Sequence, residues 1–320
     1  MQKRLVILVP FLLLLAGCAG LIGGAGTPGQ NEGAFAGGTQ ALQLGFLEGE
    51  PPEKVLDNGQ ETFMITLLLR NEGEHTIPKG KILATLSGAS REAFNLKSLT
   101  VKSDFDLEKK AKSRDQVTQG GQEELSFGVA KYKPDLPADF GLDLRADVCY
   151  DYQTEAVTSI CLKKNAFARA DVNDNCALDN PSPPVENSGG PLQVSSVKQR
   201  PTGANKIRLS FDVSNKGVGA VYPPGTFASQ CGGSQETEQQ QDSLQVSLTS
   251  TGNKYPIACS KFANGNHGTV RLVNGVKTIN CEIDTSGLQD SSFTDFLIIK
   301  MKYMYRDAVS VPLTIENSDF

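Results

Sequence analysis

The sequence has no tryptophan and only two histidines among its 320 residues. His75 and His267 stand apart from each other in polar turns, and no Cys-x-x-Cys is present, so the ligand spacing of a zinc site is missing. The composition therefore gives no reason to expect a bound metal or any other cofactor.

Catalytic motifs are also missing. We find no Gly-x-Ser-x-Gly, no phosphate-binding loop, no His-Glu-x-x-His and no dinucleotide fingerprint. The acidic pairs Asp104/Asp106 and Glu123/Glu124 lie in polar stretches, where solvated carboxylates are far commoner than a general acid and base. We therefore expect a protein that is not an enzyme.

Helical periodicities are few, whereas glycine and proline are frequent, at 32 and 16 residues. This composition favours many strands and turns, and it predicts an all-β fold. The formal net charge is −5. Because nucleic acids and anionic lipid surfaces attract basic proteins, we expect neither as a partner.

The one long apolar run lies at the N-terminus. It follows Lys3 and Arg4, is too short to span a bilayer, and leads into Leu15-Ala16-Gly17-Cys18. That tetrapeptide resembles the lipobox of prokaryotic lipoproteins, which implies removal of residues 1–17, lipidation of Cys18 and attachment to the membrane. The alternatives are an ordinary signal peptide with an incidental Cys18 and, less favoured, an uncleaved membrane helix.

Residues 18–39 are rich in glycine and alanine, which predicts a flexible tether. Beyond it we expect a β-sandwich domain at 40–165, a linker at 166–190 and a second β-sandwich domain at 191–320. Within the linker, 171–175 (Asp-Val-Asn-Asp-Asn) resembles the start of a calcium loop. Cys176 replaces the glycine and Ser182 the glutamate of that motif, so we favour a solvated turn over a calcium site.

Period-2 alternation predicts strands at 41–46, 63–70, 81–86, 96–101 and 123–129. The stretch 142–163 predicts a hairpin closed by a short loop at 154–156. In that register Tyr150 and Tyr152 lie on the core face, and Cys149 stands directly opposite Cys161.

The second half of the chain repeats the first. A shift of 144 residues places 63–73 on 207–217, including Asn71-Glu72-Gly73 on Asn215-Lys216-Gly217. A shift of 153 places 144–162 on 297–315, where Tyr303 and Tyr305 match the first tyrosine pair. Two matches in the same order indicate an internal duplication.

Six cysteines remain after Cys18, and an even number in an oxidising compartment predicts three disulfides. Parity leaves all pairings open. The strand positions favour Cys149–Cys161 and, across two short apolar stretches, Cys259–Cys281. The remaining pair would be Cys176–Cys231.

The strands that end in Asn-Glu-Gly and Asn-Lys-Gly, together with the lipobox and the Cys-Tyr-Asp-Tyr segment, resemble archaeal and bacterial cell-surface lipoproteins with immunoglobulin-like domains of the CARDB type. The resemblance implies two tandem immunoglobulin-like β-sandwiches and a non-catalytic role in adhesion or as a scaffold on the outer face of the cell membrane. A protein or a cell-surface polymer would then be the partner. The alternative is a ligand-binding lipoprotein that serves a transporter or pilus assembly.

Two segments are candidates for contacting that partner. They are the charged stretch 102–121 and the Gln/Glu/Ser-rich insertion 232–242. We expect the four hairpin tyrosines to serve the core instead.

Overall fold

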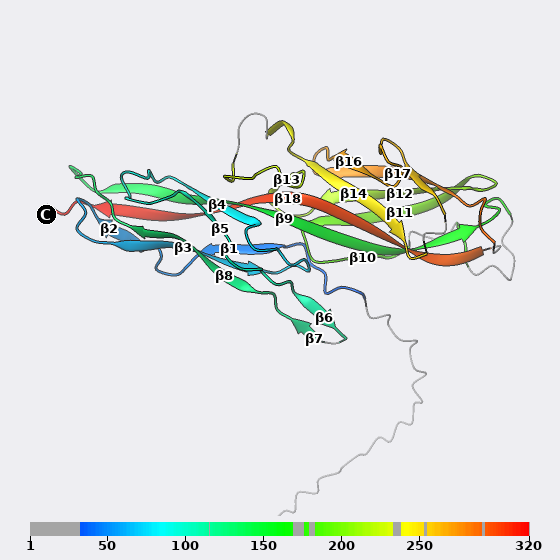
Figure 1. Cartoon of the computed structure of the whole chain (residues 1–320), viewed down its shortest axis with the longest axis horizontal. Coiled ribbons are helices and arrows are strands. Elements are labelled where there is room, and N and C mark those ends of the chain that lie inside the picture. Colours follow the sequence, from blue (N-terminus) through cyan, green and yellow to red (C-terminus); the bar gives the residue numbers. More distant parts are fainter. Residues whose placement is uncertain are drawn as a thin grey trace, which may run out of the picture. The chain divides into compact units, whose positions relative to one another are not determined.

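Two long antiparallel strands, β9 (Phe140–Lys163) and β18 (Ser292–Glu316), are the centre of the fold. They pair from Ser292 opposite Lys163 to Ile315 opposite Phe140 (Figure 1). The computed structural model describes residues 33–114, 116–168, 176–178, 183–232, 238–252, 255–289 and 292–319. The predicted signal peptide 1–17, Cys18 and the segment 171–175 lie outside these ranges.

The predicted hairpin at 142–163 is wrong, because the chain continues straight through the expected loop. Thr154 and Ala156 are fully buried, and the alternation of buried side chains runs unbroken from Tyr150 to Ile160. No glycine, proline or asparagine occurs in this stretch, so the backbone lacks the residues that a tight hairpin turn requires. The corresponding segment 307–309 also lies inside a continuous strand, β18.

The other strands complete one large sheet, two smaller sheets and a two-stranded ribbon. The large sheet has the order β16-β14-β18-β9-β4-β5, with β2 and β13 paired to β18 and β10 paired to β9. The smaller sheets are β1-β3-β8 and β11-β12-β17-β15, and the ribbon is β6-β7. The bounds are β1 Leu42–Phe46, β2 Lys54–Leu56, β3 Phe63–Asn71, β4 Ile82–Ser87, β5 Thr100–Lys102, β6 Ala111–Ser113, β7 Gln116–Thr118, β8 Gln122–Ala130, β10 Val185–Asn187, β11 Leu192–Gly203, β12 Lys206–Asn215, β13 Ala220–Tyr222, β14 Ser243–Ser250, β15 Ile257–Cys259, β16 His267–Arg271 and β17 Val276–Asp284.

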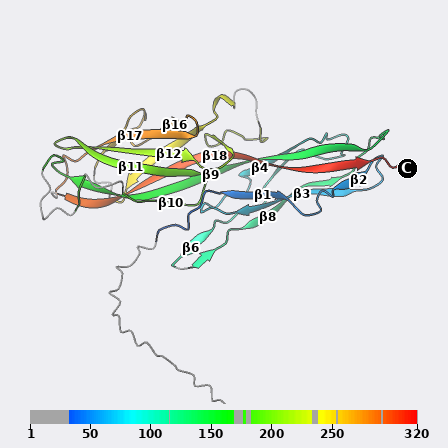
Figure 2. The same ribbon diagram turned by 180° about the vertical axis from the view of Figure 1, so that it is seen from behind.

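The first half (residues 40–165) and the second half (191–320) use the same strand order. The sheet β1-β3-β8 corresponds to β11-β12-β17, and the row β5-β4-β9 corresponds to β16-β14-β18. Figures 1 and 2 show β1, β3 and β8 alongside one part of the β9–β18 pair and β11, β12 and β17 alongside the other part. An all-β fold is therefore confirmed, and β10 lies within the predicted linker.

Each long strand begins in its own half and ends in the other. β9 pairs with β4 through residues 145–150, and β18 pairs with β14 through 297–302. Further along β9, the Cys161 amide donates to the side chain of Gln199 on β11 (2.8 Å), which donates back to the Cys161 carbonyl (3.0 Å). At the end of β18, Ile315 lies opposite Val55 of β2. The two halves thus exchange their last strands, as a strand-swapped dimer does, but within one chain.

The repeated Asn-x-Gly motifs fix the same turn in both halves. The Asn71 side chain donates to the His75 carbonyl (2.8 Å) and accepts from the Gly73 amide (3.1 Å). In the second half Asn215 makes the corresponding bonds to Gly219 (2.9 Å) and Gly217 (3.1 Å). These bonds satisfy backbone groups that leave the strand ladder.

Tyrosine hydroxyls then attach these turns to the long strands. Tyr152 accepts from the His75 amide (3.3 Å), and Tyr305 accepts from the Gly219 amide (2.8 Å). A Cβ at Gly73 would come within 1.9 Å of the Tyr152 hydroxyl, so only glycine fits there. The motif and the tyrosine therefore form one unit in each half.

The hydrophobic core is continuous across the two halves, and residues from Gly33 onwards form one compact unit. At its centre four buried tyrosines, Tyr150, Tyr152, Tyr303 and Tyr305, pair across β9 and β18. The cross-strand ring centroids are 5.9 and 6.0 Å apart, which is the spacing of favourable aromatic pairs. The core role expected for these tyrosines is confirmed.

The last part of the predicted tether binds the folded part. The Ala36 and Gly37 amides donate to the Glu74 carboxylate (both 2.9 Å), which also accepts from the Gly189 amide (2.8 Å). Glu74 thereby joins residues 36 and 37 to the predicted linker.

Candidate functional site

Two of the three predicted disulfide pairings are wrong. The structure joins Cys149 to Cys231 and Cys161 to Cys176, with Cα separations of 5.4 and 5.6 Å. Cys149 and Cys161 lie on the same strand, where twelve residues extend over about 40 Å, so they cannot be bridged. The predicted pairings Cys149–Cys161 and Cys176–Cys231 both depended on the hairpin.

The third predicted pairing is present. Cys259 of β15 and Cys281 of β17 are directly opposed in the ladder and form a disulfide. In this case the alternation of two short strands was sufficient, because the pair involves neighbouring antiparallel strands.

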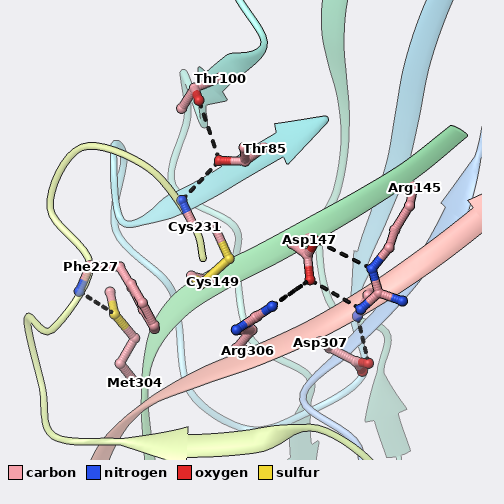
Figure 3. Close-up of a disulfide and its surroundings, with 11 residues drawn as sticks. Thr85, Thr100, Arg145, Asp147, Cys149, Phe227, Cys231, Met304, Arg306 and Asp307 are labelled. Atoms are coloured by element: carbon pink, nitrogen blue, oxygen red, sulfur yellow. Dashed lines mark hydrogen bonds and ion pairs between the residues drawn. A yellow bond between two sulfur atoms is a disulfide. The ribbon is translucent and has the colours of Figure 1, made fainter. Parts of the chain in front are cut away.

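The Cys149–Cys231 disulfide fixes a loop of the second half, residues 223–232, onto β9 and β4. The Cys231 amide donates to the Thr85 hydroxyl of β4 (2.8 Å), as Figure 3 shows. The Gly225 amide donates to the Asp151 carboxylate (3.1 Å), and Lys102 donates to the Ala228 carbonyl (3.1 Å). The loop is therefore held along its length by β4, β5 and β9, all from the first half.

A small apolar cluster, separate from the main core, lies under this loop. It consists of Leu83, Cys149, Tyr222, Phe227, Cys231 and Met304. The Tyr222 and Phe227 rings meet edge to face with centroids 4.8 Å apart, and the Phe227 amide donates to the Met304 sulfur (3.2 Å). The loop thus closes over apolar surface where β9 and β18 cross from one half to the other.

Beside the disulfide, one carboxylate holds two arginines. Asp147 accepts from Arg145 (3.1 Å) and from Arg306 (3.2 Å), which lies on β18 (Figure 3). Burial, the largest single cause, lowers the pKa of Arg306, but the charge and hydrogen bond of Asp147 together with the Tyr222 hydroxyl outweigh burial, so the pKa of Arg306 is raised. Arg145 donates to both oxygens of the Asp147 carboxylate, whereas Arg306 donates twice to one of them. Such charge-assisted hydrogen bonds position planar groups rigidly.

These three side chains, with Asp307 and Tyr222, line a pocket of about 400 Å³. The two arginines and two aspartates leave it with no formal charge. The arrangement contains no serine, cysteine or histidine beside a base, so it offers hydrogen-bond donors and acceptors but no activated nucleophile.

Sequence reasoning missed this cluster. Arg145 and Asp147 occupy alternate positions of β9, separated by the buried Ala146, and Arg306 of β18 lies opposite Cys149. The sequence shows that these charged residues alternate with apolar ones. It does not show that Asp147 and Arg306 are in contact, because that contact depends on the pairing of β9 with β18.

The histidines differ from each other. His267 is exposed, whereas His75 is half-buried edge-on against Tyr152, with ring centroids 5.3 Å apart. Burial lowers the pKa of His75. His75 is thus only partly exposed, although it lies in a polar turn.

The structure describes the two candidate contact segments, 102–121 and 232–242, to different extents. The charged stretch 102–121 includes the β6-β7 ribbon, and Leu107 within it is buried and paired with Ile77. In the insertion 232–242, residues 233–237 lie outside the described ranges. The charged stretch is therefore partly structural.

The described residues contain neither a metal-binding cluster nor a membrane-spanning helix. They hold no group of three or more His, Cys, Asp or Glu side chains placed to bind a metal ion. Within the same ranges, a helix of the length and apolar character needed to cross a bilayer is not found.

Comparison with known proteins identifies no family. No family model matches the sequence, and no curated protein matches it. Among solved structures, the secreted serine protease VesC from Vibrio cholerae aligns at 10% identity over 78% of this chain, with a TM-score of 0.18. The alignment spans about half (48%) of that protein, and a TM-score of this size does not indicate a shared fold.

Proposed function

We propose that this chain is a lipid-anchored protein of the outer cell surface with a non-catalytic role in adhesion or as a scaffold. Its folded part would consist of two immunoglobulin-like β-sandwiches that exchange their last strands. Cys18 would carry the lipid, and residues up to about 32 would separate the membrane from the folded part.

The observation that carries this proposal is the pair of long strands together with three disulfides. Disulfides persist in oxidising compartments outside the cytoplasm. An uninterrupted antiparallel ladder from Phe140 to Lys163 links the halves through backbone hydrogen bonds, and Cys149–Cys231 adds a covalent link. Such a rigid connection suits a protein that must hold two binding surfaces in a fixed relation.

The alternative, a lipoprotein that delivers a small molecule to a membrane partner, has less support. Such a protein would need an enclosed, mostly apolar pocket. The pocket beside Cys149–Cys231 is lined by four charged side chains, and Tyr222 supplies its one aromatic ring.

Replacing Cys18 with serine tests the anchor. The native protein should incorporate a labelled lipid precursor and remain with the membrane fraction. Cys18→Ser should lose the label and be released or remain unprocessed. Full labelling of the variant would contradict lipid anchoring.

A surface role is tested separately by attachment of whole cells. Cells lacking the protein should attach less well to a surface or to each other, and the native gene should restore attachment where Cys18→Ser does not. Unchanged attachment in cells lacking the protein would contradict a role in adhesion.

A further inference from the structure

A polar recess on the outer face of the large sheet is separate from the pocket at the disulfide. It has a volume of about 590 Å³ and lies over three neighbouring strands, β16, β14 and β18. Its lining includes two lysines, Lys261 and Lys302, and no aspartate or glutamate. The recess is therefore positively charged, although the formal net charge of the whole chain is −5.

The floor of the recess is formed by hydrogen-bonding side chains in register. Thr269, Gln245 and Lys302 lie opposite one another across β16, β14 and β18. Neighbouring strands are about 4.8 Å apart, so the three side chains form one row roughly as long as a sugar ring with its substituents. Val246, Val270 and Met301, which alternate with them, are buried, so the row faces outward.

One wall is a short loop, residues 260–266, that is held rigidly. The Cys259–Cys281 disulfide fixes its start, and the Cys259 amide donates to the Gly265 carbonyl (2.7 Å). At its end, Asn266 exchanges hydrogen bonds with Leu248 of β14, with the Leu248 amide and the Asn266 side chain as donors (both 2.9 Å). The wall is therefore preorganised, which lowers the cost of binding.

Lys261 lies on this wall in the left-handed backbone region, with φ of 72°. A non-glycine residue there is strained, and such strain persists only where the surroundings impose it. In the described part of the chain, neither Lys261 nor Lys302 forms an ion pair, although Lys300, two residues before Lys302, pairs with Glu155 (3.2 Å). Both lysines thus remain available to an external anion.

We propose that this recess binds an acidic polysaccharide, with carboxylate groups at Lys261 and Lys302 and hydroxyl groups at Gln245 and Thr269. The inference rests on the proposed surface role and names the class of its partner. Amide and hydroxyl side chains beside two ammonium groups match the alternating hydroxyls and carboxylates of a uronic acid chain.

The test uses the full-length protein in mild detergent and measures binding to polygalacturonate by calorimetry, with uncharged dextran as the control polymer. The native protein should bind polygalacturonate and not dextran. The double variant Lys261→Gln/Lys302→Gln should bind about tenfold more weakly, because it loses two charge-assisted hydrogen bonds. Gln245→Leu, which keeps the charge, should also weaken binding.

Lys198→Gln is the matched control, because Lys198 is exposed on β11 and outside the recess. It should bind as the native protein does. No binding by the native protein, or equal weakening in Lys198→Gln and in the double variant Lys261→Gln/Lys302→Gln, would overturn the proposal.

The two proposals can fail independently. Loss of binding while Cys18 labelling persists would remove the recess and leave the surface role. Binding that persists while Cys18 carries no lipid would remove the anchor and leave the recess.

Discussion

At the residue scale, a small number of buried polar side chains replace backbone partners where the chain leaves a strand. Asn71 is fully buried and bonds to both the His75 carbonyl and the Gly73 amide. Because buried backbone groups left unpaired are costly, Asn71 and its counterpart Asn215 should contribute more to stability than their size suggests.

Asn71→Ala and Asn215→Ala should each reduce the free energy of unfolding by about 1–3 kcal/mol. The exposed Asn280 of β17, changed to alanine, is the control and should have little effect. Urea midpoints measure all three. A loss no larger for Asn71→Ala than for Asn280→Ala would contradict the structural role of the motif.

The tyrosine cluster makes stability depend on alkaline pH. Burial raises the pKa of Tyr150, Tyr152 and Tyr303, and it raises the pKa of Tyr305 to about 12. The folded protein therefore keeps phenol protons that the unfolded chain loses near pH 10, as the ordinary tyrosine pKa dictates. This contribution is complete below that pH and is lost as pH rises from about 10 towards 12.

Urea unfolding should thus show a contribution from these tyrosines that is constant from about pH 8 to pH 10 and falls between about pH 10 and pH 11. Tyr305→Phe should make the fall shallower, since one perturbed phenol is removed. The phenolate absorbance of the folded native protein should develop above the ordinary tyrosine range. Full phenolate absorbance in the folded protein near pH 10 would contradict the burial of these rings.

At the scale of elements, alternation along the first half located β1, β3, β4 and β8, whereas the strand expected at 96–101 begins only at Thr100 as β5. The strands at 63–70, 81–86 and 123–129 became β3, β4 and β8 with small changes at their ends. The prediction of a hairpin at 142–163 was wrong because a hairpin and one continuous strand show the same period-2 alternation. The missing turn residues between Tyr152 and Thr158 were the signal against it.

Shortening a buried side chain near the end of either long strand should destabilise the half into which that end extends. Ile315 and Leu162 are fully buried, and changing either to alanine should reduce the free energy of unfolding by about 2–5 kcal/mol. Ile315→Ala should increase hydrogen exchange in β2 and β3, and Leu162→Ala should increase it in β11 and β12. If Leu162→Ala loosened β3 and β4 instead, the strands would not be exchanged.

At the scale of the whole molecule, strand exchange explains why the cysteines pair as they do. The hairpin would bring Cys149 to Cys161, whereas a continuous β9 carries Cys161 away to Cys176 and leaves Cys149 beneath the 223–232 loop. The sequence could show the number of disulfides. Their partners depend on the path of β9, which lies beyond local pattern.

The cluster of Arg145, Asp147 and Arg306 could not be predicted from the sequence for the same reason. Asp147 and Arg306 are far apart in sequence and meet because β9 and β18 pair in antiparallel register. The recess over β16, β14 and β18 likewise needs three strands in register before Thr269, Gln245 and Lys302 lie together.

Peptide mapping without reduction tests the strand exchange most directly. Trypsin is unsuitable, because no lysine or arginine separates Cys149 from Cys161. A protease that cleaves after Asp and Glu cuts at Asp151 and Glu155, between the two cysteines. The structure predicts that the Cys149 peptide is linked to the Cys231 peptide and the Cys161 peptide to the Cys176 peptide. A peptide pair linking Cys149 to Cys161 would show that the strands fold back as hairpins and would contradict the exchange.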